Sequence, residues 1–205
     1  MKDSREKASY CIGLETGKQL RQQFKEMDVN LLAEGLQDGF TQSQPKLTGD
    51  EITAVLTAIR QQVETQQKQF LSKLAQENKS KSEKFLEQNK KHEGIVTLPS
   101  GLQYKVLKSG SGASPTLLDV VNVHYRGYFI DGKEFESTYQ REKPQTFPVN
   151  RVIPGWAEAL QKMKVGDQWR IFIPSYLAYG EMGFGPEIEP NVALIFDMEL
   201  LSINP

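Results

Sequence analysis

The sequence predicts an α+β protein in two parts, an all-helical N-terminal domain followed by an antiparallel sheet wrapped on one short helix. Aromatic residues are unevenly spread, since both tryptophans and six of the seven tyrosines lie after residue 94. Residues 50–91 contain no proline and no glycine, and their apolar residues recur at helical spacing. After residue 94, β-branched and aromatic segments alternate with glycine-containing turns. We therefore predict a helical domain with a long connecting helix over residues 1–93 and a sheet domain over residues 94–205.

Three helices are predicted in the N-terminal domain. The first covers residues 4–24, and the second runs from an N-cap at Asn30 to about Phe40. Thr48 and Glu51 have the spacing of a capping box, so the third helix is expected to start at residue 49 and to end near residue 91. Its forty or so residues would span roughly 60 Å, at about 1.5 Å per residue.

Only the first half of this long helix keeps an apolar face, which ends near Leu74. We expect that half to pack with the N-terminal helices, within one chain or across a dimer. The second half is nearly all polar until Phe85, so we expect it to cross solvent as a rod. A loop is the alternative for residues 77–84, but their alternating charges and helix-forming residues favour a helix.

The sheet domain is predicted from five extended segments and one short helix. The helix covers residues 155–163, and Pro154 is suited to its first position because proline at that point has no amide hydrogen to leave unpaired. The glycines of residues 108–114 are too few and wrongly spaced for a phosphate-binding loop, so we predict a turn there. The extended segments are residues 102–108, 119–130, 147–150, 167–174 and 192–203.

Composition and charge exclude several classes of function. A net charge of −1 argues against a nucleic-acid-binding protein, and no apolar run reaches the roughly 20 residues of a membrane span. The charged first ten residues lack the apolar stretch of a secretory signal. This observation does not decide whether the protein is secreted, because a signal is removed from the mature chain. Cys11 is the only cysteine, so no disulfide forms within one chain, and we expect a small buried residue there. We predict no metal site and no cofactor, because the two histidines are not clustered with other ligand-type residues.

Aromatic residues are the main candidates for a functional site in the sheet domain. Such residues are often plain core, but several of these lie beside glycines or at the ends of elements, in "HYRG", "IPGW" and "AYGE", which favours a binding pocket. The set is Tyr125, Phe135, Phe147, Trp156, Tyr179 and Phe196, interleaved with Val152, Ile153 and Ile188.

Several long stretches of this half are recognisable. They are "SGLQYKVLKSGSG", "VNVHYRGYFIDGKEFEST", "VIPGWAEALQKMKVGD" and "IPSYLAYGEMGFGPEIEPNVALIFDMELL". With them, residues 94–205 closely resemble the FK506-binding-protein (FKBP) family of peptidyl-prolyl cis–trans isomerases. Residues 1–93, with "SYCIGLETG" and "LLAEGLQDGF", resemble the helical extension of the bacterial macrophage-infectivity-potentiator (Mip) and FkpA-type isomerases.

The resemblance implies a role for each residue of the aromatic pocket. Trp156 would form the floor on which a proline ring lies, and the Ile153 amide and the Tyr179 hydroxyl would donate hydrogen bonds to substrate carbonyls. The implied catalytic residues are Tyr125, Phe135, Glu136, Trp156 and Tyr179. The implied substrate-binding residues are Val152, Ile153, Arg141, Phe147, Phe184, Ile188 and Phe196.

Two positions depart from the family pattern. Glu136 stands where the family usually has aspartate, and the extra methylene puts its contact with Tyr125 or with substrate in question; a solvated surface carboxylate is the alternative. Gln145 replaces an aromatic residue and opens one wall, and Phe184 would supply part of the lost apolar surface.

The resemblance further implies a V-shaped homodimer, formed through residues 1–93, that catalyses X–Pro isomerisation in unfolded proteins and assists their folding. Its partners would be proline-containing polypeptides and macrolide inhibitors of the FK506 and rapamycin type. The implied location is the bacterial cell envelope, in the periplasm or at the outer membrane after signal removal, with the cytoplasm as the alternative. Two other functions stay open, a proline-binding module with weak turnover and a coiled-coil tether that carries a passive domain.

Overall fold

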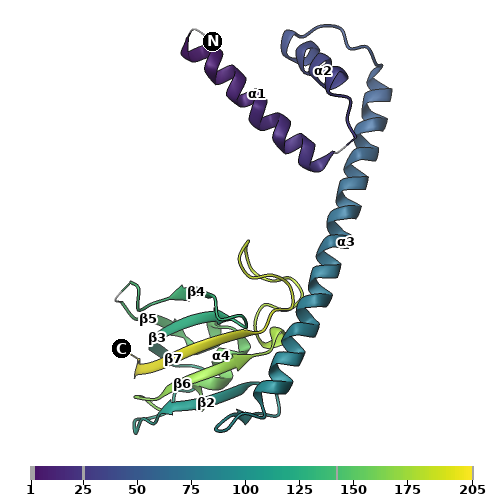
Figure 1. The fold of residues 1–205 in the computed structure, drawn as a ribbon. Helices are drawn as coiled ribbons and strands as arrows, with labels where there is room; N and C mark the ends of the chain where they lie inside the picture. Colours follow the sequence, from purple (N-terminus) through teal and green to yellow (C-terminus); the bar gives the residue numbers. More distant parts are fainter. Residues whose placement is uncertain (1–2, 25, 142, 205) are drawn as a thin grey trace. The chain divides into compact units, whose positions relative to one another are not determined.

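A computed structural model describes residues 3–24, 26–141 and 143–204 (Figure 1). The chain forms two compact units, Met1–Gln62 and Val63–Pro205. The division falls inside the long helix α3 (Gly49–Asn89), whose second half therefore belongs to the unit that contains the sheet. The predicted domain boundary at residue 94 was drawn from a change in composition, not from contacts, and it stays a prediction.

The first unit contains α1 (Ser4–Gln23), α2 (Val29–Thr41) and the start of α3. The prediction of Asn30 as N-cap is wrong, because the Asp28 carboxylate accepts hydrogen bonds from the Asn30 and Leu31 amides at 2.8 and 3.1 Å. The expectation that Cys11 is buried is also wrong, since none of the described residues of α1 and α2 is buried within one chain.

The start and the length of α3 are confirmed. The Glu51 carboxylate accepts hydrogen bonds from the amide and the hydroxyl of Thr48, both at 2.8 Å, and the Thr48 hydroxyl accepts from the Glu51 amide at 3.3 Å. This reciprocal pair is the predicted capping box. The helix continues without a break through residues 77–84 and ends at Asn89.

The second half of α3 is not a rod in solvent, as the sequence suggested. Asn78, Ser82 and Asn89 are buried on one face of the helix, against the sheet unit, and Phe85 contacts Phe172 with ring centroids 6.0 Å apart. The three polar side chains hydrogen-bond to residues 14 to 112 positions away in the sequence. A polar helix face can therefore be buried here, because each polar group finds a partner.

The sheet has seven strands, all antiparallel, in the order β1-β2-β6-β7-β3-β4, with β5 also paired to β3. β1 (Val96–Thr97) and β4 (Glu134–Ser137) were not predicted, and β5 (Gln145–Pro148) begins two residues before the expected segment. The remaining strands match predicted segments to within two residues. They are β2 (Gln103–Lys108), β3 (Val120–Phe129), β6 (Gln168–Ile173) and β7 (Leu194–Ile203).

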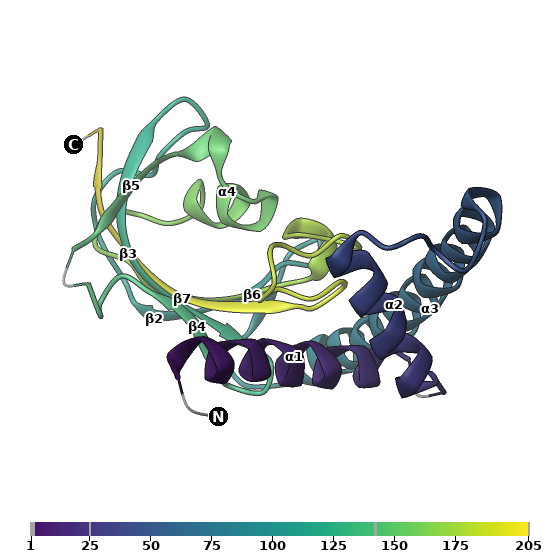
Figure 2. The ribbon, with the colours of Figure 1, turned by 90° about the horizontal axis from the view of Figure 1, so that it is seen from above.

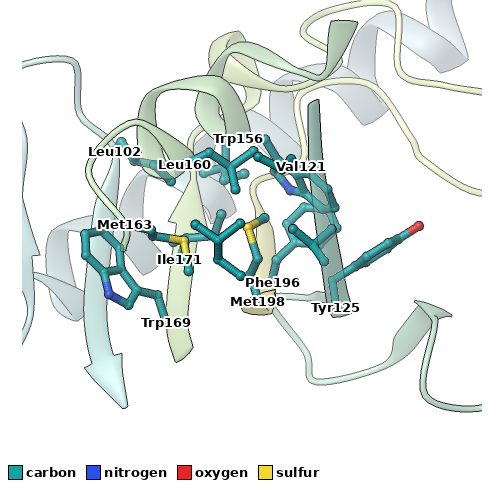
Figure 3. Close-up of a cluster of buried hydrophobic side chains, with 14 of the residues drawn as sticks. Leu102, Val121, Tyr125, Trp156, Leu160, Met163, Trp169, Ile171, Phe196 and Met198 are labelled. Atoms are coloured by element: carbon teal, nitrogen blue, oxygen red, sulfur yellow. The ribbon is translucent and has the colours of Figure 1, made fainter. Parts of the chain in front are cut away.

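The sheet curves around the short helix α4 (Pro154–Leu160), which lies on its concave side (Figure 2). Pro154 occupies the first turn, as predicted, but the helix ends three residues before the expected residue 163. The core fills the space between helix and sheet and is made of fully buried side chains such as Leu160, Val121 and Ile171 (Figure 3). At one end of this core the Tyr125 hydroxyl points away from the cluster, toward the site described next.

Candidate active site

A hollow of about 720 Å³ lies between α4, strands β3, β4, β5 and β7, and the segment that follows Tyr179. Every predicted site residue except Arg141 lines it. Its walls are Tyr125, Phe135, Glu136, Gln145, Phe147, Arg151, Val152, Ile153, Trp156, Tyr179, Phe184, Gly185, Pro186, Glu187, Ile188 and Phe196.

Trp156 lines this hollow and is 5% exposed. The rings of Tyr125, Phe147 and Phe196 stand nearly perpendicular to the indole, with centroids 4.8, 5.7 and 5.2 Å from it. Edge-to-face contacts are favoured between aromatic rings because the positive ring edge meets the negative ring face. The indole N–H finds no hydrogen-bond partner among the described residues, so ring packing holds the indole in place.

The sequence "IPGW" explains why tryptophan can stand at the start of a helix. Pro154 opens α4, and the Ile153 carbonyl accepts from the Trp156 amide at 2.9 Å, which closes the first turn. A side chain at position 155 would put its Cβ 2.4 Å from Ile173 Cγ2, so only glycine lets α4 approach the sheet this closely. The indole is thereby brought to the end of the core.

A network of polar groups borders one side of the hollow. The Tyr125 hydroxyl donates to Glu136 Oε1 at 2.7 Å, and Gln145 Oε1 lies 3.1 Å from the same hydroxyl. Arg141 donates from Nη2 to Glu136 Oε1 at 3.1 Å. Arg141 does not line the hollow, so its link to the hollow is the hydrogen bond to Glu136.

Burial raises the pKa of Tyr125 above its ordinary value, and the hydrogen bond to Glu136 and its negative charge raise it further. Burial, followed by the charge of Glu136, likewise raises the pKa of Tyr179. Both phenols therefore keep their protons at neutral pH. The Tyr125 proton is engaged by Glu136, whereas the Tyr179 hydroxyl makes no hydrogen bond to any described residue and remains available as a donor.

Comparison with known proteins places both parts of the chain. Residues 5–106 match the model of the domain amino-terminal to FKBP-type peptidyl-prolyl isomerase, and residues 112–201 match that of the FKBP-type peptidyl-prolyl cis-trans isomerase. The outer membrane protein MIP of Legionella longbeachae is 44% identical over 97% of this chain and 85% of its own length. The crystal structure of FkpA from Escherichia coli has a TM-score of 0.79 and 37% identity, and it covers 100% of this chain and 99% of that one. The chain belongs to the FKBP-type peptidyl-prolyl cis-trans isomerases.

A further relative matches in sequence along nearly its whole length. The FKBP-type 22 kDa isomerase of Escherichia coli is 42% identical over 96% of this chain and 94% of its own length. The predicted combination of a helical N-terminal part and an FKBP-like antiparallel sheet is thus confirmed. Within the described ranges, no helix has both the length and the apolar character needed to cross a membrane.

Sequence reasoning missed four residues of the FKBP hollow. Arg151 immediately precedes Val152, and residues 185–187 follow Phe184, so all four adjoin predicted positions in the chain. Only their position next to predicted site residues in the sequence could have indicated them, because none of them is aromatic. Glu187 and Arg151 add one charge of each sign to the rim.

Proposed function

We propose that this FKBP-type isomerase binds proline-containing segments of unfolded or exposed polypeptides in the hollow above Trp156 and accelerates rotation about the X–Pro bond. The observation that carries the proposal is the indole of Trp156, which lies between three perpendicular rings in a hollow lined largely by aromatic and aliphatic side chains. A flat apolar floor with aromatic walls suits the ring of proline. The macrolides FK506 and rapamycin are proposed to compete for the same floor.

The proposed mechanism needs no proton transfer and no covalent intermediate. Rotation about a peptide bond breaks amide resonance, which sets a barrier of about 18–20 kcal/mol. The twisted amide is less polar than the planar one, so a dry, ring-lined hollow disfavours the planar ground state more than the transition state. Each 1.36 kcal/mol or so of this difference gives about a tenfold rate increase.

Two donors are proposed to hold the substrate backbone. Ile153 and Tyr179 both line the hollow, and neither the Ile153 amide nor the Tyr179 hydroxyl hydrogen-bonds to another described residue. Each can therefore donate to a substrate carbonyl without breaking a bond of the free enzyme. Glu136 and Arg141 would hold the Tyr125 ring in place through the hydroxyl network.

The two tryptophans provide a matched test of the pocket. Trp156 and Trp169 are each 5% exposed, but Trp169 stacks on Tyr104 and does not line the hollow. We expect Trp156→Leu to lower kcat/KM on a short X–Pro peptide by about tenfold or more, since it removes the flat floor. Trp169→Leu should keep the activity although it removes a core side chain of the same size. Equal losses in both variants would contradict the assignment of the floor.

The same assay separates isomerase from binding module. If the wild-type protein binds a proline peptide but turns it over no faster than buffer, the weak-turnover alternative holds. The bond from Tyr125 to Glu136 supports turnover, because the longer carboxylate still reaches the phenol.

We further propose a homodimer, formed through residues 1–93, with chaperone-like folding activity. Large apolar side chains of the first unit are exposed within one chain, among them Ile12 at 68%, Leu36 at 62% and Phe40 at 91%. Exposed apolar surface on this scale indicates a protein interface. When an unfolded chain is bound in one pocket of the dimer, the second pocket is present at a raised local concentration.

The bacterial cell envelope is the proposed location, because one relative is named an outer membrane protein. Fractionation of native cells, with sequencing of the mature N-terminus, tests this. A cleaved leader and recovery with periplasmic or outer-membrane proteins are expected, whereas recovery with cytoplasmic proteins would favour the alternative.

A further inference from the structure

One segment of the sheet unit carries three of the proposed site residues and lies outside the named strands. This pocket hairpin, residues 179–191, includes Tyr179, Phe184 and Ile188. The amide and carbonyl of Phe184 pair with the carbonyl and amide of Ile188 at 2.8 and 3.1 Å, and the Asn191 amide donates to the Gly180 carbonyl at 2.8 Å. The Tyr179 ring stacks on Phe184 with centroids 4.9 Å apart. The hairpin is therefore internally ordered, but its placement depends on what holds its ends.

Helix α3 holds the end that follows Ile188. Asn78 donates from Nδ2 to Glu189 Oε2 at 2.9 Å and to the Pro190 carbonyl at 3.1 Å. The Ser82 hydroxyl donates to the Asn191 carbonyl at 3.0 Å and accepts from the Ala193 amide at 2.8 Å. Consecutive residues at the end of the hairpin are thus bound by two side chains one helical turn apart.

The bound residues include one in a left-handed backbone conformation. Asn191 has a φ of +59°, in the region that asparagine adopts more readily than most residues other than glycine. Its side chain donates to the Ala75 carbonyl of α3 at 3.3 Å, so the helix contacts this residue on both backbone and side chain. Asn78 and Ser82 are 7% and 4% exposed, so both side chains are largely withdrawn from solvent.

We infer that Asn78 and Ser82 are positioning residues of the isomerase, which hold the pocket hairpin, and with it Ile188 and Phe184, in the geometry of the prolyl site. The inference rests on the proposed function of the hollow, because the hairpin matters for catalysis only if the substrate contacts it. It gives the second half of α3 a task beyond linking the two units. The helix sets one wall of the pocket.

A different contact of α3 allows a control that distinguishes positioning of the pocket hairpin from attachment of the helix to the sheet. Asn89 is also 7% exposed, and its Nδ2 donates to Gln103 Oε1 at 2.8 Å. Gln103 lies in β2 and does not line the hollow. Asn89→Ala therefore weakens the attachment of α3 to the sheet without touching the pocket hairpin.

The test uses the full-length protein and the variants Asn78→Ala, Ser82→Ala and Asn89→Ala. Three quantities are measured: kcat/KM on a short X–Pro peptide, the Kd for FK506, and the hydrogen exchange rates of the Phe184, Ile188 and Asn191 amides. Asn78→Ala and Ser82→Ala should each change all three by about fivefold or more, because a buried backbone group loses its partner. Amides in the centre of β3 and β7 should keep their exchange rates. Ser82→Ala removes a single atom, so it gives a folded protein even if Asn78→Ala does not.

In Asn89→Ala the unfolding free energy should fall while kcat/KM and the hairpin exchange rates stay within about twofold of the wild type. Wild-type hairpin exchange in both Asn78→Ala and Ser82→Ala would overturn the inference, as would an equal effect of Asn89→Ala. Failure of the proposed function looks different: the wild-type protein would lack isomerase activity, while the exchange rates would still report whether α3 holds the hairpin.

Discussion

The hydroxyl of Tyr125 donates a 2.7 Å hydrogen bond to the carboxylate of Glu136. Glutamate at this position thus reaches the phenol, although the family usually has the shorter aspartate here. Glu136 lies in β4 opposite Gly127 of β3, lines the hollow and also accepts a hydrogen bond from Arg141. The Glu136 side chain is 43% exposed, so a solvated surface carboxylate remains the alternative to a role in the site.

We predict that Glu136→Asp lowers kcat/KM on a short X–Pro peptide by less than tenfold. The shorter side chain weakens one hydrogen bond of the kind that contributes about 1 kcal/mol, which corresponds to roughly fivefold. Glu136→Gln is the control, because it keeps the length and an acceptor oxygen but removes the charge. A loss of more than about a hundredfold in either variant would mean that the carboxylate takes part in the reaction itself.

The raised pKa of Tyr125 predicts a loss of stability at high pH. Burial first, and Glu136 second, raise the pKa in the folded state above the value near 10 of an unfolded chain. The folded state therefore holds the proton more tightly, and this contribution to stability is complete below about pH 10 and declines as the pH rises toward the folded-state pKa.

Chemical denaturation between about pH 8 and pH 11 measures this effect. The free energy of unfolding should fall above about pH 10 in the wild type and should fall less steeply in Tyr125→Phe, which has no proton to lose there. Part of the slope should remain, because Tyr139 and Tyr179 also have raised pKa values. Identical slopes in both proteins would show that Tyr125 titrates alike in the folded and unfolded states.

Gly127 leaves little room for a side chain, because the rings of Phe135 and Phe196 lie where a Cβ would be. A Cβ at this position would lie 2.6 Å from Phe135 Cζ and 2.9 Å from Phe196 Cε1. Gly127→Ala should therefore destabilise the protein by about 1–3 kcal/mol and reduce isomerase activity, since both rings must shift. Adding Phe135→Leu should restore part of the stability, as a double-mutant cycle by denaturation will show. If the losses in unfolding free energy of the two single variants simply add in the double variant, the Phe135 ring is not what the added methyl group meets.

Local sequence patterns were enough to predict most of the secondary structure. The capping box of Thr48 and Glu51, the unbroken helix after it and the proline at the start of α4 depend on residues within a few positions of one another. The short strand β4 was missed because four residues are too few to show an alternating pattern. Periodicity finds long elements and overlooks short ones.

Contacts between distant residues were out of reach of the same reasoning. Asn78 and Ser82 look like solvated positions of a polar helix, and only partners 109 to 112 residues away explain their burial. The setting of the aromatic residues beside glycines suggested a pocket and the family resemblance assigned roles within it, because core tryptophans and pocket tryptophans are equally apolar. Trp156 and Trp169 illustrate this, since both are 5% exposed and only one lines the hollow.

The exposed apolar face of α2 predicts where the proposed dimer forms. Leu36 and Phe40 lie one helical turn apart and are 62% and 91% exposed within one chain. We expect Leu36→Glu combined with Phe40→Glu to give a monomer by sedimentation equilibrium, because burying two carboxylates in an apolar interface is strongly unfavourable. Leu118→Glu is the matched control, since Leu118 is 89% exposed in the sheet unit and its change should leave the dimer intact.

Activity of that monomer distinguishes the roles of the two units. The hollow lies entirely within Val63–Pro205, so kcat/KM on a short peptide should stay within about twofold of the wild type. Refolding of a denatured protein limited by proline isomerisation should slow, because the second pocket no longer adds to the effective concentration. An unchanged refolding rate would mean that one chain suffices and that the helical unit has another task, such as the tether considered above. A dimer that persists in the double variant would place the interface on a different face of the chain.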